Sequence, residues 1–126
     1  MTTGMDLRNI LKQFNITPKK SLGQNFIFDQ EILDRIVAAG DVSPQDTVLE
    51  IGPGAGSLTR RLAETAARVV AVELDERLIP VLQHTLAEYS NVTVVQGDIL
   101  TVQLPTSKLQ TPNAYKVVAN IPYHLT

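Results

Sequence analysis

The chain has 126 residues, of which 44% are hydrophobic and 19% charged, a composition typical of one globular domain with a modest core. It contains no cysteine, which excludes disulfides, cysteine metal ligands and thiolate catalysis. No segment reaches the roughly 20 apolar residues of a membrane span, and the N-terminus lacks the apolar core of a signal peptide. We therefore expect a cytoplasmic protein without membrane contact.

The formal net charge of -2 is unevenly divided along the chain. Residues 1–23 carry a single acidic residue, Asp6, against the basic residues Arg8, Lys12, Lys19 and Lys20. The rest of the chain is acidic on balance. Contact with a polyanion such as nucleic acid is therefore expected near the beginning of the chain, although a solvated charged face explains the same pattern.

Apolar residues recur with helical spacing over residues 7–14 and again over residues 26–39. In the second pattern Asp29 is a suitable N-cap, and Gly40 is placed to end the helix. From residue 47 the pattern changes to short apolar runs rich in β-branched residues. These are TVLEIG at 47–52, RVVAVEL at 68–74, VTVVQGD at 92–98 and YKVVANIP at 115–122. Such runs are typical of parallel strands covered on both faces.

Helical segments separate the first three predicted strands, over residues 57–66 and 76–89, with Pro80 near the start of the second. This alternation predicts right-handed crossovers and an open α/β sheet. Residues 100–113 are predicted to be a loop. Four strands make a short doubly wound sheet, and nothing follows the last one to cover its edge, so we expect a fragment of a longer protein.

The sequence VLEIGPGAG places Gly52, Gly54 and Gly56 between the first strand and the following helix. In open α/β sheets ligands bind at the carboxyl ends of the strands, and glycines there let the backbone approach a bound molecule. A simple connecting turn is the alternative. A nicotinamide site would favour G-x-G-x-x-G, but Ser57 occupies the third glycine position, and the pattern is E-x-G-x-G-x-G beginning at Glu50.

Acidic side chains end the next two predicted strands. Glu73 follows the glycine loop at a distance where a carboxylate can accept both hydroxyls of a ribose. Asp98 can accept from the exocyclic amine of an adenine while Ile99 packs on the ring. Each has a structural alternative: Glu73 and Asp75 could cap the following helix, and Asp98 could stabilise a turn. Together with the glycines they predict a nucleoside site.

The fourth predicted strand delivers the sequence NIPY to the same edge. Asn120 offers a carbonyl acceptor, Pro122 stiffens the turn, and Tyr123 offers a ring on which a base can stack. Acceptors that hold the hydrogens of an adenine amino group would turn the nitrogen lone pair toward an electrophile. Positioning, and not a strong base, would then promote attack.

The motifs SLGQNFIFD, EIGPGAGSLT, VELD, GDI and NIPY, in this order, resemble those of the ribosomal RNA adenine dimethyltransferases, most closely the small-subunit branch. The resemblance extends from about residue 22 to the end. It implies the Rossmann-like fold of S-adenosylmethionine-dependent methyltransferases, truncated after the fourth strand. Residues 1–24 would form a basic arm with a short helix, and residues 25–126 the donor-binding domain, without the later strands and the helical RNA-binding domain.

The resemblance implies a set of residues that contact S-adenosylmethionine: Asn25, Ile27, Gly52, Gly54, Glu73, Asp98, Ile99 and Asn120. The glycine loop would receive the methionine end of the donor. Asn120, Pro122 and Tyr123 would be the catalytic residues around the target adenine, which must leave its stack to reach them. Lys19 and Lys20 are the candidate RNA contacts.

The implied activity is dimethylation of the 6-amino group of two adjacent adenosines, in a hairpin near the 3′ end of small-subunit (16S) ribosomal RNA. The expected partner is that RNA or the immature small subunit, and the expected state is a monomer. A large-subunit (23S) rRNA adenine methyltransferase conferring macrolide resistance and a non-catalytic RNA-binding or assembly factor remain alternatives. His84 and His124 form no metal constellation with nearby acids, so no metal is expected.

Overall fold

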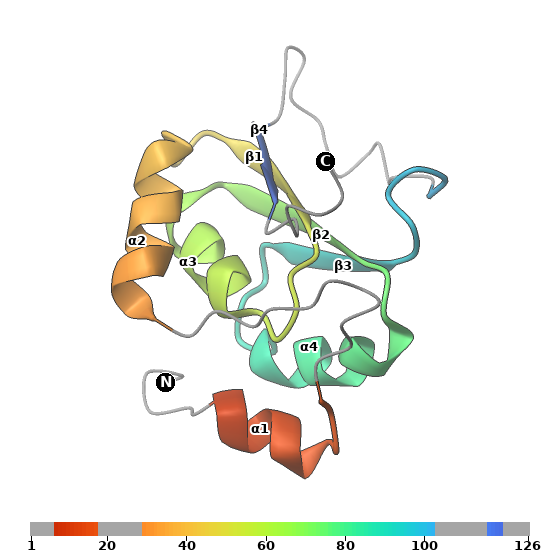
Figure 1. The fold of residues 1–126 in the computed structure, drawn as a ribbon. Coiled ribbons are helices and arrows are strands. Elements are labelled where there is room, and N and C mark those ends of the chain that lie inside the picture. Colours follow the sequence, from red (N-terminus) through yellow and green to blue (C-terminus); the bar gives the residue numbers. More distant parts are fainter. Residues whose placement is uncertain (1–6, 18–28, 103–115, 120–126) are drawn as a thin grey trace.

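A computed structural model of the chain describes residues 7–17, 29–102 and 116–119 (Figure 1). The elements follow one another along the chain as α1 (Leu7–Gln13), α2 (Gln30–Ala39), β1 (Thr47–Ile51), α3 (Ser57–Thr65), β2 (Arg68–Glu73), the 3-10 turn η2 (Glu76–Leu78), α4 (Ile79–Thr85), β3 (Val92–Gln96) and β4 (Lys116–Ala119). The predicted domain boundary after residue 24 lies outside the described residues.

The strands form one parallel sheet in the order β3-β2-β1-β4. The open parallel α/β sheet predicted from the sequence is thereby confirmed for the described residues. In the register, Ile51 of β1 pairs with Val72 of β2 and with Ala119 of β4, while Glu73 pairs with Gln96 of β3. The carboxyl ends of all four strands therefore meet at one edge of the sheet.

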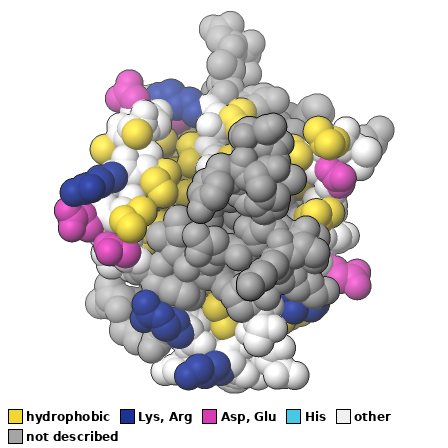
Figure 2. All heavy atoms as spheres, viewed as in Figure 1, with side chains coloured by type: hydrophobic (Ala, Val, Ile, Leu, Met, Phe, Trp, Pro, Cys, Tyr) yellow, Lys and Arg dark blue, Asp and Glu magenta, His cyan; other side chains and the backbone are white. Residues whose placement is uncertain are grey.

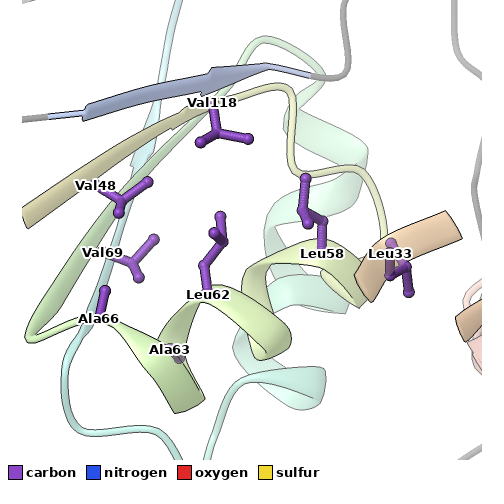
Figure 3. Packing of buried hydrophobic residues seen from close by; sticks show 8 residues of the cluster. All are labelled: Leu33, Val48, Leu58, Leu62, Ala63, Ala66, Val69 and Val118. Atoms are coloured by element: carbon purple, nitrogen blue, oxygen red, sulfur yellow. The ribbon is translucent and has the colours of Figure 1, made fainter. Parts of the chain in front are cut away.

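Helices α2 and α3 cover one face of the sheet. Val48, Val69 and Val118 point from β1, β2 and β4 toward Leu58 and Leu62 of α3, as Figure 3 shows. Leu62 is fully buried, as are two of the three valines. Burial of side chains of this size stabilises a fold by about 1.5–3 kcal/mol each, so this cluster fixes α3, and with it the loop before α3, against the sheet.

Two helix boundaries depend on local polar groups. The Asp29 carboxylate accepts from the amides of Glu31 and Ile32, so the second predicted helix begins as α2 directly after this N-cap. Pro80 lies in the first turn of α4, where its missing N–H costs no hydrogen bond.

The sequence prediction was wrong about the end of α4. The apolar spacing predicted one helix over residues 76–89, whereas the chain forms a 3-10 turn and then a helix that ends at Thr85. A turn replaces the last helical turn, and it keeps Leu86 buried. Tyr89 is half-buried, and its hydroxyl donates to Glu64. The helical spacing therefore predicted correctly that Leu86 is buried, but it did not predict where the helix ends.

Candidate nucleoside site at the sheet edge

The predicted site residues of three strands lie at the same edge of the sheet. The Gly52 amide donates to the Val72 carbonyl at 2.9 Å, and the Gly97 amide donates to the Glu73 carbonyl at 2.9 Å. These bonds extend the ladder one residue past each strand, so the glycine loop, Glu73 and the turn at Asp98 emerge side by side. The structure thus brings together the described part of the predicted site.

The loop between β1 and α3 has a backbone that only glycine adopts readily. Gly54 and Gly56 have φ values of 61° and 95°. A Cβ at Gly56 would lie 2.9 Å from the Thr85 hydroxyl oxygen, closer than real Cβ atoms approach their neighbours, and 3.3 Å from Leu82, a tight contact. The glycine at position 56 is therefore required both by the backbone angle and by the close approach of α4.

Glu73 ends β2, and its side chain connects this strand to the glycine loop. Its Oε1 accepts from the Gly54 amide at 3.0 Å and its Oε2 accepts from the Asp75 amide at 2.8 Å. Burial raises the pKa of the Glu73 carboxyl, while the two amides act in the opposite direction. Glu73 does not cap the following 3-10 turn; Asp75 does, by accepting from the Arg77 amide. Each Glu73 oxygen retains acceptor capacity for a further donor such as a ribose hydroxyl.

Asp98 lies in a turn after β3. Its Oδ1 accepts from the Leu100 amide at 2.9 Å, the arrangement expected of an aspartate that stabilises a turn. The side chain is exposed, and its second oxygen can accept from a ligand amine. Ile99 packs toward the apolar cluster of Leu49 and Val72 on the sheet.

A second carboxylate, Glu50, lies on β1 and contacts α3, and the sequence pattern identified it only as the first residue of E-x-G-x-G-x-G. Glu50 is fully buried; its Oε1 accepts from the Thr59 hydroxyl at 2.5 Å, and its Oε2 has no hydrogen-bond partner. The pKa of Glu50 is raised to about 7, mainly by burial and also by the nearby Glu73 charge, while the Thr59 hydrogen bond acts in the opposite direction. A buried charge next to an unpaired oxygen is costly, so the Glu50 carboxyl stays protonated up to about pH 7.

Sequence reasoning missed Thr85, which holds the glycine loop. Its hydroxyl is buried and donates to the Ala55 carbonyl at 2.9 Å, linking α4 to the loop. The signal was present: Thr85 interrupts the apolar face made by Val81, Leu82 and Leu86, and a polar residue on such a face needs a partner.

The other predicted site residues lie outside the described residues: Asn25, Ile27, Asn120, Pro122, Tyr123, Lys19 and Lys20. His84 is exposed, and its ring lies 6.0 Å from that of Phe14. Within residues 7–17, 29–102 and 116–119, no group of three or more His, Cys, Asp or Glu could hold a metal ion. Across the same residues, none of the helices has the length and apolar content that crossing a membrane requires.

A family model described as ribosomal RNA adenine dimethylase matches residues 15–126. The chain belongs to this family. Its sequence is 49% identical over 120 residues to ribosomal RNA small subunit methyltransferase A of Levilactobacillus brevis, with 93% of this chain and 40% of the relative covered. The family resemblance inferred from the motifs is confirmed.

Solved structures agree with this placement. The 23S rRNA methyltransferase ErmE superposes with a TM-score of 0.67 at 38% identity, over 78% of this chain and 38% of that one. A dimethyladenosine transferase from Plasmodium falciparum gives a TM-score of 0.66 at 30% identity, over 81% of this chain and 35% of that one. The chain thus has the Rossmann-like fold of S-adenosylmethionine-dependent methyltransferases. It spans about two fifths of the length of the curated relatives it matches.

Proposed function

We propose that this chain binds S-adenosylmethionine at the sheet edge and takes part in the dimethylation of adenosine in small-subunit ribosomal RNA. The observation that carries the proposal is the arrangement around Glu73, a buried carboxylate joined to the Gly54 amide beside the glycine loop. A buried carboxylate lies here beside a glycine loop whose backbone a ligand can approach closely. This arrangement suits a ligand that has ribose hydroxyls at one end and a charged amino-acid part at the other.

Each described residue then has a role toward the donor. The glycine loop would receive the methionine end, Glu73 would accept from the ribose hydroxyls, and Asp98 would accept from the adenine amine, with Ile99 beside the ring. The donor would supply an electrophilic methyl group. The residues of this chain would orient the donor and exclude water from it, which is the contribution of positioning to the rate.

The proposed target is the 6-amino group of two adjacent adenosines near the 3′ end of 16S ribosomal RNA. The relative from Levilactobacillus brevis is named as a small-subunit enzyme, which favours this target over the 23S RNA on which ErmE acts. Asn120, Pro122 and Tyr123, which follow β4 in the chain, are proposed to hold the target adenine.

The N-terminal face is the proposed RNA contact. Arg8 and Lys12 lie on the exposed face of α1, and Figure 2 shows Lys and Arg side chains over this helix at the bottom of the view. With the predicted contacts Lys19 and Lys20 they would form the basic surface that phosphate recognition requires.

Replacement of Glu73 tests the donor site. We expect Glu73→Ala to weaken S-adenosylmethionine binding by about 10- to 100-fold, because two charge-assisted hydrogen bonds to the ribose are lost. Isothermal titration calorimetry with S-adenosylmethionine and S-adenosylhomocysteine measures this. Glu64→Ala, which removes an exposed glutamate on α3, is the matched control and should bind normally. Equal affinity in Glu73→Ala and the unchanged chain would rule out the ribose role.

Replacement of Asn120 tests methyl transfer separately from donor binding. We expect Asn120→Ala to leave the donor affinity within about twofold and to lower the rate of methyl transfer by about 100-fold or more, because it removes an acceptor that orients the adenine amine. Incorporation of labelled methyl groups into immature small ribosomal subunits is the measurement, with the Levilactobacillus brevis relative as positive control. Unchanged transfer in Asn120→Ala would contradict the assigned role.

A further inference from the structure

Arg77 joins two parts of the chain that are 60 residues apart. Its Nη1 and Nη2 both donate to the Thr17 carbonyl at 3.3 Å. Its Nε donates to both Asp75 oxygens at 3.0 Å, and its Nη2 donates to Asp75 Oδ2 at 2.5 Å. One planar guanidinium therefore holds the end of the N-terminal segment, residues 7–17, and the residue that follows β2 by two positions.

The contacts of Arg77 continue to the donor edge. The Asp75 amide donates to Glu73 Oε2 at 2.8 Å, and Glu73 Oε1 accepts from the Gly54 amide. A continuous chain of hydrogen bonds thus runs from Thr17 through Arg77, Asp75 and Glu73 to the glycine loop. The Asp75 side chain is 4% exposed and that of Arg77 28%, so solvent screens this ion pair less than one on the open surface.

A second contact joins the same two parts of the molecule. The apolar face of α1, with Leu7, Ile10 and Leu11, packs in one cluster with Ala55 of the glycine loop and with Val81 of α4. Figure 1 shows α1 lying beside α4, on the side of α4 away from the sheet. The N-terminal segment therefore packs against the glycine loop, the proposed binding site of the donor, and this packing does not depend on Arg77.

We propose that Arg77 is a positioning residue that couples the N-terminal segment to the donor edge, so that donor binding and the placement of Thr17 depend on each other. The inference rests on the proposed donor site. A donor that fixes Glu73 also fixes the Asp75 amide, and through Arg77 the Thr17 carbonyl. The coupling is reciprocal, so whatever holds Thr17 in place would strengthen donor binding by the same factor.

Amide hydrogen exchange in the N-terminal segment measures this coupling. The Ile16 amide donates to the Leu11 carbonyl at 2.8 Å, so its exchange reports opening of the segment directly before Thr17. In the unchanged chain, S-adenosylhomocysteine should slow Ile16 exchange. In Arg77→Ala we expect exchange to be about tenfold faster without ligand, the slowing by ligand to disappear, and donor affinity to fall by about fivefold.

Two further variants separate coupling from a general loss of stability. Arg61→Ala removes another arginine that joins two segments, through Asp34 on α2, and it should leave Ile16 exchange and its response to ligand unchanged. Arg77→Lys keeps the positive charge, but it lacks the planar guanidinium that donates to Asp75 and Thr17 at once. Ligand should therefore slow Ile16 exchange more in Arg77→Lys than in Arg77→Ala, but less than in the unchanged chain.

The outcomes distinguish this inference from the proposed function. If the unchanged chain bound no donor in calorimetry, the proposed function would fail, and the coupling would fail with it. Normal donor binding, combined with an Ile16 exchange rate that ligand does not alter or that Arg77→Ala does not change, would overturn the coupling alone.

Discussion

Gly56→Ala is expected to lower the free energy of unfolding by about 2–4 kcal/mol and to weaken donor binding at least tenfold. A left-handed backbone costs an L-residue about 1–2 kcal/mol, and the φ of Gly56 is 95°. The added Cβ would also meet the Thr85 hydroxyl oxygen at 2.9 Å and Leu82 at 3.3 Å, and overpacking of this kind costs about 1–3 kcal/mol. Relief of either conflict moves the loop away from α4, so the donor site changes together with the fold.

Gly40→Ala is the matched control for this prediction. Gly40 ends α2 with a φ of -76°, and an added Cβ would lie 3.4 Å from Val42, an ordinary contact. Alanine there should leave the free energy of unfolding unchanged or raise it by up to about 1 kcal/mol, because the unfolded chain loses freedom. Urea denaturation and donor calorimetry on both variants make the comparison. A Gly56→Ala chain as stable as Gly40→Ala would show that the loop tolerates a side chain at position 56.

The sheet, and the edge at which Glu73, Asp98 and the glycine loop lie, were predictable from the sequence because they depend on short-range patterns. Continuous apolar runs located the strands, and parallel pairing then placed Glu73, Asp98 and the glycine loop at one edge without any knowledge of side-chain contacts. The end of α4 was not predictable in the same way, because Leu86 keeps helical spacing while lying in a turn.

The partners of the side chains that hold the site together were beyond the sequence pattern, even where, as at Thr85, the sequence indicated that a partner was needed. Thr85 reaches the carbonyl of Ala55, and Arg77 reaches that of Thr17, 60 residues earlier in the chain. Such bonds to backbone carbonyls require no particular residue type at the accepting position, so no motif marks them. Only the folded chain shows which carbonyl each side chain meets.

Glu50 makes the stability of the fold dependent on pH, and we expect the free energy of unfolding to fall by about 3 kcal/mol between pH 4.5 and pH 8 from this group alone. The pKa of the buried Glu50 carboxyl is about 7, against an ordinary value of 4.5. Well below pH 4.5 the carboxyl is protonated in both the folded and unfolded chains and contributes no pH dependence. As the pH rises, the unfolded chain releases its proton first and is thereby favoured, until the folded chain also ionises near pH 7.

Glu50→Gln should remove this decline, because its side chain cannot ionise and its carbonyl can still accept from Thr59. A smaller slope of the same sign would remain, since burial also raises the pKa of Glu73. Urea denaturation from pH 4.5 to 8 measures the effect, with Glu64→Gln as a control that should keep the full decline because Glu64 is exposed on α3. A decline as steep in Glu50→Gln as in the unchanged chain would mean that the folded protein stabilises the Glu50 carboxylate, and the cause would then have to be sought in Glu73 or elsewhere.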